Sequence, residues 1–383
     1  MNFDDFLHSP DPSGCVGGSD SSFIDPWQEY KTISCRLKKR FLRKPNLAEA
    51  SRAFNALASK LAPRPGTRSL SDPFGGTGCY HYAGFCQLAV ARCEHSLGNI
   101  CGEASGLREA GRCFIAAQRD ESNLLGLRSL GEHATCAAHC YGHAIRVHLE
   151  HNEPGLAGEF CLEFGTLLYF LSHEYATGDC CKSDPLMDDA YSMFERANRL
   201  LRDIDVGRYA AMRWMITIAV ETGKYPLALS LVEQLINHGS NTKSTNQDSK
   251  EKSNHYVAQV EQDVEVLTVL LLLMLRHIGK QMKSEHSRLL ARYSDFDTCN
   301  NQSDRIPESN IRCFELQSYL HSFCTSVIAS NNMTLNCANN ITETLSMMWP
   351  VLNRVQRLVA LRLTDRCSSI CSGGSGDDCV MLL

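Results

Sequence analysis

The sequence lacks any sustained alternation of apolar and polar residues, which is the pattern of a half-buried β-strand. It also lacks the motifs G-x-S-x-G and H-E-x-x-H, so nucleophilic and zinc-dependent hydrolysis have no recognisable starting point. The glycine cluster at residues 75–78 is not followed by the Lys and Ser or Thr of a phosphate-binding loop. We therefore predict that the chain has no catalytic residues and no bound cofactor, and that it is not an enzyme.

The sequence also lacks a transmembrane segment. Residues 266–275 are nearly all apolar, but a bilayer span needs about 20 such residues. Glu261, Asp263 and Glu265 come directly before this run. We expect a helix that is buried on most sides, either inside this protein or against another one.

No secretory signal precedes the cysteines, because the first residues are acidic and polar. The chain has 19 cysteines, and most lie in apolar helical patterns, where a thiol behaves as a small hydrophobic group. We expect reduced thiols and a cytoplasmic protein, with an early-endosomal association or a nuclear location as further options.

Small and apolar residues recur at helical spacing over residues 86–120. Ala110 is followed by Phe114 and then by Ala117, at intervals of one helical turn. This spacing is typical of a tetratricopeptide-type hairpin, in which small residues let two antiparallel helices approach and Phe114 fills the groove. One hairpin cannot cover its own apolar face, so it needs neighbours of the same kind.

Three further segments repeat this pattern around Ala157, Ala190 and Ala228. The segment at Ala190 is the clearest repeat, because Phe194 and Ala197 follow at the same spacings. One interval between successive anchors matches the period of about 34 residues, and the other two require longer loops or helices. The predicted fold class is all-α, a tetratricopeptide-like α-solenoid of helical hairpins.

Composition divides the chain into five parts. Serine, glycine and other polar residues mark two disordered tails and one flexible linker between helical parts. The parts are a tail at 1–30 with a short contact at Phe23, Ile24 and Trp27, a helical-repeat segment at 31–236 with a basic first helix, a linker at 237–256, a C-terminal helical segment at 257–366, and a tail at 367–383. We expect the last helix of the C-terminal segment to include Met347, Met348, Trp349, Pro350 and Leu352.

The segment at 133–143 is the densest set of metal-type ligands. His133, Cys136, Cys140 and His143 would share one helical face, which would suit zinc. However, this segment extends about 15 Å along a helix at 1.5 Å per residue, so one ion could bind only an adjacent pair. We therefore favour packing between hairpins over a metal site.

The strongest charged feature is a basic helix near residue 40. It allows three interpretations: a solvated helix face, a nucleic-acid or nuclear-import patch, or a docking surface for an acidic protein or an anionic membrane. Only one aromatic residue interleaves the charges, which argues against RNA binding. The residues are Lys38, Lys39, Arg40, Phe41, Arg43 and Lys44.

Four blocks of sequence carry a resemblance to a known family. They are LKKRFLRKPNLAEA (37–50), CQLAVARC (86–93), AIRVHLEHNEPGLAGEFCLE (144–163) and MWPVL (348–352). In this order they resemble the forty-kilodalton huntingtin-associated protein family.

The resemblance implies an all-α, tetratricopeptide-like solenoid without enzymatic activity that binds huntingtin, a very large helical-repeat protein. It further implies a link to an early-endosomal Rab GTPase. The residues themselves lack a continuous basic stripe and a long apolar run, so we expect neither a nucleic-acid partner nor a membrane span. On this basis we expect a huntingtin-binding scaffold that buries apolar helical faces, including the run at 266–275, in an interface of more than about 2,000 Å². The alternative is a trafficking adaptor that docks a small GTPase or an anionic membrane without huntingtin. The expected partner-binding residues are Lys38, Lys39, Arg40, Phe41, Arg43, Lys44 and Trp349.

Overall fold

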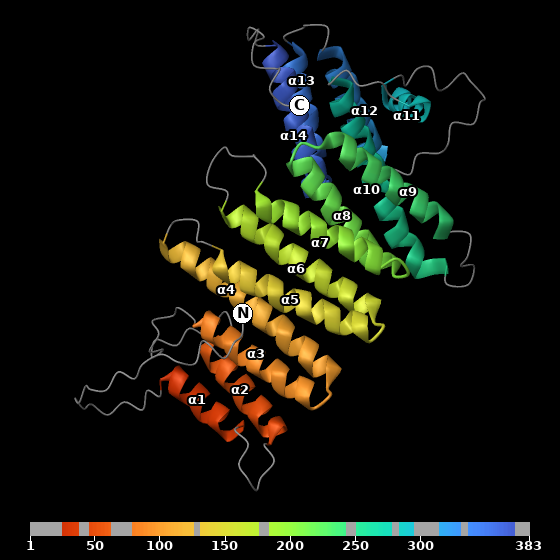
Figure 1. Cartoon of the computed structure of the whole chain (residues 1–383). Helices are drawn as coiled ribbons and strands as arrows, with labels where there is room; N and C mark the ends of the chain where they lie inside the picture. The colour runs from red at the N-terminus through yellow and green to blue at the C-terminus, as the bar shows by residue number, and fades with distance from the viewer. Residues whose placement is uncertain are drawn as a thin grey trace. The chain divides into compact units, whose positions relative to one another are not determined.

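The computed structural model describes residues 25–37, 46–62, 79–125, 131–175, 184–242, 250–277, 283–294, 314–330 and 336–371. Within these ranges the chain forms α-helices and turns and no strand, which confirms the all-α prediction (Figure 1). The helices are α1 (Pro26–Leu37), α2 (Leu47–Leu61), α3 (Tyr80–Ser96), α4 (Ile100–Leu125), α5 (Glu132–Glu150), α6 (Pro154–Tyr175), α7 (Pro185–Leu200), α8 (Asp205–Glu221), α9 (Tyr225–Thr242), α10 (Lys250–His277), α11 (Ser284–Ser294), α12 (Phe314–Ser330), α13 (Asn336–Met348) and α14 (Arg354–Cys371).

The chain divides into two compact units, Met1–Ala144 and Ile145–Leu383. The division falls within α5, whereas composition suggested a division at the polar stretch 237–256. A polar stretch of sequence is expected to be exposed to solvent, but this does not make it a boundary. The boundary between two units depends on which helices pack together.

In the first unit α1 packs on α2, α2 on α3 and α3 on α4. Helix α2 begins after a capping residue, because the side chain of Asn46 accepts a hydrogen bond from the backbone N–H of Glu49 at 3.1 Å. The apolar stripe of α2 lies against α1 and α3. The buried cluster at this contact comprises Ile33, Ala50, Phe54, Leu57, Ala58, Leu61, Ala83, Cys86, Ala89 and Cys93.

Helices α3 and α4 approach closely because glycine and alanine lie at their contact. A Cβ atom at Gly84 would lie 2.9 Å from the ring of Phe114, which is 1% exposed. A Cβ atom at Gly106 would lie 3.0 Å from the backbone nitrogen of Ala91. The predicted role of Phe114 as the filler of this groove is therefore confirmed.

The second unit contains an equivalent pair in α6 and α7. Phe194 is fully buried, and a Cβ atom at Gly165 would lie 2.9 Å from its ring. The four predicted anchors of the hairpins are also fully buried in their respective units. They are Ala110, Ala157, Ala190 and Ala228.

Three of the connections between helices are Schellman turns. Gly98, Asn152 and Gly223 adopt positive φ angles of 71°, 58° and 74° after α3, α5 and α8. In each turn the next residue donates its N–H to the carbonyl five residues earlier, as from Lys224 to Ala219 at 2.8 Å. Such turns reverse the chain within a few residues.

The apolar run at 266–275 lies in the middle of α10 and is buried within the second unit. None of its residues is more than 7% exposed, and α10 packs on α9, α11, α12 and α14. Of the two expectations for this run, burial inside this protein is confirmed. Its contribution to a partner interface is wrong, because neighbouring helices of the same chain already cover it.

Several boundaries differ from those expected from composition. Pro26 opens α1 inside the expected tail, helped by Asp25, whose side chain accepts the N–H of Trp27 at 3.0 Å. Trp27 stacks on Tyr30 with a centroid distance of 5.4 Å, whereas Phe23 and Ile24 lie outside the described residues.

Helices also enter the expected linker and the expected C-terminal tail. Helix α9 extends to Thr242 and α10 begins at Lys250, so only residues 243–249 of that linker lie outside the described residues. Helix α14 continues to Cys371, with Cys367 fully buried. Polar residues do not prevent a helix, because its backbone hydrogen bonds are internal and its outer face is solvated.

The last helix that the sequence predicted, with Met347 and Leu352 in one element, is divided into two helices in the structure. α13 ends at Met348 and α14 begins at Arg354. Pro350 lies between them, and proline disfavours a continuing helix because it lacks the N–H and restricts the residue before it.

Candidate partner-binding surface

The sequence-predicted partner-binding residues fall in two places. Lys38, Lys39, Arg40, Phe41, Arg43 and Lys44 lie outside the described residues. Trp349 lies in the turn between α13 and α14 and is 36% exposed. The described part of the candidate surface is therefore this turn.

The turn holds large apolar side chains in solvent because its two ends are anchored in the core. Met348 and Leu352 are 0% and 3% exposed, respectively. Between and beside them Met347, Trp349 and Val351 are 43%, 36% and 49% exposed. We call these three side chains the apolar turn surface. Aromatic residues and methionine are enriched at protein interfaces, so this composition is suited to binding a partner.

Arg357 holds Trp349 in place. Its Nε donates a hydrogen bond to the carbonyl oxygen of Trp349 at 3.0 Å, and its guanidinium lies 5.1 Å from the centre of the indole ring. The ring quadrupole attracts such a cation, which adds about 0.5–1 kcal/mol at exposed sites. This contact favours the observed orientation of the indole, which would reduce the entropic cost of binding.

Helix α14 is fixed directly after the turn by a capping box. The Asn353 side chain accepts the N–H of Gln356 at 3.0 Å, and the Gln356 side chain accepts the N–H of Asn353 at 2.8 Å. Gln356 is 1% exposed, and its amide also donates to the carbonyl of Asp263 on α10 at 2.9 Å. The start of α14 is thus attached to α10, whose apolar run is buried in the unit.

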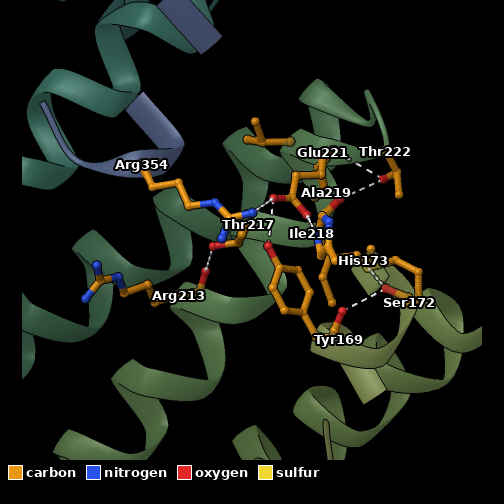
Figure 2. Close-up of polar contacts among 12 residues, drawn as sticks. Tyr169, Ser172, His173, Arg213, Thr217, Ile218, Ala219, Glu221, Thr222 and Arg354 are labelled. Atoms are coloured by element: carbon orange, nitrogen blue, oxygen red, sulfur yellow. Dashed lines mark hydrogen bonds and ion pairs between the residues drawn. The ribbon is translucent and has the colours of Figure 1, made fainter. Parts of the chain in front are cut away.

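A carboxylate at the end of α8 connects α14 to α6 (Figure 2). Glu221 accepts a hydrogen bond from the Tyr169 hydroxyl at 2.7 Å and pairs with His173 at 3.0 Å and with Arg354 at 3.3 Å. Burial, and then the hydrogen bond and charge of Glu221, raise the pKa of Tyr169 above its usual range. Arg362 adds a second connection, because it donates to the carbonyl of Glu221 at 2.9 Å.

The residues considered for zinc do not form a metal site. His143 lies 3.7 Å from Glu103 and His133 lies 4.0 Å from Glu121, so each is beside a different carboxylate. Burial raises the pKa of Cys140 to about 12, so this thiol is protonated at neutral pH and a poor ligand. Within the described ranges, no group of three or more His, Cys, Asp or Glu residues is arranged to hold a metal ion.

A depression among α8, α9, α10 and the start of α14 encloses about 30 Å³. Small-molecule sites usually have roughly 300–1,000 Å³, so this depression is small for such a site. No described helix combines the length and the apolar character that a bilayer crossing requires. The candidate surface on α13 and α14 is therefore described by its exposed apolar side chains, Met347, Trp349 and Val351.

No protein-family model matches the chain. A stretch of 140 residues is 41% identical to the 40-kDa huntingtin-associated proteins of Rattus norvegicus and Mus musculus. Over this stretch the chain is similar to these proteins. The match covers 36% of this chain and 33% of each relative, so it spans about a third of the length of these relatives. The family name describes association with huntingtin for the rat and mouse proteins, and it mentions no enzymatic activity.

The sequence identified Trp349 through the family resemblance but not the groups that position it. Arg357 and Glu221 carry no motif, and their roles depend on the turn at Pro350 and on the packing of α14 against α8. The one sequence signal available was the spacing of Asn353 and Gln356, three residues apart, which is typical of a capped helix start.

Proposed function

We propose that this chain is a non-catalytic, tetratricopeptide-like α-solenoid that binds huntingtin and stabilises it. The observation that carries the proposal is the 41% identity with proteins named for association with huntingtin. The apolar turn surface supports it, because it presents three exposed apolar side chains next to a turn that is anchored in the core by Met348 and Leu352.

The packing within each unit supports the solenoid part of the proposal. In the first unit α1 packs on α2, α2 on α3 and α3 on α4, and in the second unit α6 packs on α7, α7 on α8, α8 on α9 and α9 on α10. Helices that contact mainly their sequence neighbours are the defining property of a repeat protein. The Schellman turns at Gly98 and Gly223 provide the short reversals that hairpins need.

On the resemblance alone, we also propose that the protein acts in the cytoplasm and links huntingtin to early endosomes through a Rab GTPase. The basic residues at 38–44 would then steer association with an acidic surface, which affects mainly the association rate. Reversing five of these charges should reduce capture of huntingtin more at low salt than at high salt. Equal capture at every salt concentration would remove this segment from the interface.

The main test is co-purification of the chain with full-length huntingtin, followed by an affinity measurement. Trp349→Ala should weaken binding by about 10-fold or more, because exposed tryptophans often dominate interface energies. Trp27→Ala is the matched control, since Trp27 is 39% exposed in the other unit and also lies beside a cation, Lys31, at 5.5 Å. Failure of the unmodified chain to bind huntingtin would overturn the proposed function.

A further inference from the structure

From the geometry of the turn between α13 and α14, we infer that Arg357 and the apolar turn surface together bind a carboxylate that lies beside an apolar side chain. The occupant would be an acidic segment of the partner with an Asp or Glu next to apolar residues. This inference rests on the proposed function and names the chemistry that the partner presents.

The guanidinium of Arg357 is held so that it can accept such a group. Its Nε is used in the bond to the Trp349 carbonyl, and its central carbon Cζ lies over the indole, 5.1 Å from the ring centroid. Among the described residues, neither terminal nitrogen of Arg357 makes a hydrogen bond or an ion pair. These two nitrogens form a fork whose geometry matches the two oxygens of a carboxylate.

The surrounding charge favours an anion at this position. The first turn of α14 contains no acidic residue but carries both Arg354 and Arg357, where the helix dipole is already positive. The charge of Arg354 is compensated by Glu221, whose carboxylate oxygen lies 3.3 Å from the guanidinium. No described carboxylate lies within 4.0 Å of Arg357, and Glu343, the nearest acid before the turn, is exposed on α13 without contacting it.

The apolar turn surface determines the rest of the occupant. Met347 and Val351 lie beside Trp349 in sequence and are 43% and 49% exposed, so an incoming apolar side chain would cover them. Contact with these groups would exclude water from the ion pair and strengthen it. A purely acidic segment would leave these side chains in water, and a purely apolar one would leave Arg357 without its counter-ion.

The test measures huntingtin binding by variants of the full chain at two salt concentrations. Arg357→Gln should weaken binding about 10- to 100-fold and reduce its salt dependence, and Arg357→Lys should retain only part of the affinity because the fork is lost. Arg366→Gln is the matched control, an arginine of the same helix whose guanidinium lies 5.9 Å from the ring of Tyr225, and it should bind normally. Thermal melts confirm that each variant is folded.

Photo-crosslinking identifies the occupant directly. A photoreactive phenylalanine analogue at Val351 should crosslink a huntingtin peptide that has an Asp or Glu within a few residues of the attachment site. Normal binding by both Arg357 variants, or a crosslinked peptide without an acidic residue, would overturn this inference while leaving huntingtin binding intact. If the unmodified chain does not bind, both proposals fail.

Discussion

Substitution of Gly84 by alanine tests whether α3 and α4 approach as closely as the structure places them. The new Cβ would lie 2.9 Å from Cε1 and Cζ of Phe114 and 3.2 Å from Cδ1, whereas ordinary contacts are 3.4–4 Å. The ring cannot move aside easily, because it is 1% exposed and lies edge-on to Phe85 at 5.5 Å. Such overpacking costs about 1–3 kcal/mol.

Alanine also stabilises a helix relative to glycine by about 1 kcal/mol, which opposes the steric cost. Gly142→Ala is therefore the matched control, since its Cβ would meet nothing within 4 Å and Gly142 belongs to the same unit. We expect Gly142→Ala to raise the free energy of unfolding by about 0.5–1 kcal/mol. We expect Gly84→Ala to lower it by up to about 2 kcal/mol.

The assay is urea denaturation followed by circular dichroism, with midpoints compared at equal slopes. The difference between the two variants isolates the steric effect, because the gain in helix propensity is common to both. Phe114→Leu should reduce the cost of Gly84→Ala, which a double-mutant cycle measures. Equal stabilisation by the two alanines would refute the close packing of α3 on α4.

Three further predictions concern the second unit and the thiols. Leu271→Ala should lower the free energy of unfolding by about 2–5 kcal/mol in urea denaturation, because Leu271 is fully buried in α10. A decrease of less than about 0.5 kcal/mol, as is usual for exposed residues, would contradict its burial. Glu221→Gln should cost about 1–2 kcal/mol, since charge-assisted hydrogen bonds are exchanged for neutral ones, and hydrogen exchange at the start of α14 should become faster. At pH 8 iodoacetamide should modify exposed Cys101 rapidly and Cys140 only after unfolding. The pKa of Cys140 is raised to about 12, which leaves about one thiolate in ten thousand at this pH; equal rates by peptide mass spectrometry would contradict this.

Local sequence was sufficient for the fold class and for the contacts within hairpins. Helical spacing predicted that Phe114 and Phe194 fill grooves opposite small residues, and both side chains are buried against glycine. Such predictions succeed because residues one turn apart share a helix face whatever the rest of the chain does. The cap at Asn46 was predictable for the same reason, since both partners lie within one turn.

The tertiary structure alone decided which apolar surface remains available for a partner. Residues 266–275 and the turn at Trp349 are both apolar in sequence, yet the first is covered by four helices and the second is exposed. The position of Arg357 over the indole likewise depends on the break at Pro350 and on the anchoring of Leu352. Burial of an apolar side chain lowers the free energy wherever the burial takes place. Only the packing of distant segments determines whether this chain or another molecule covers that side chain.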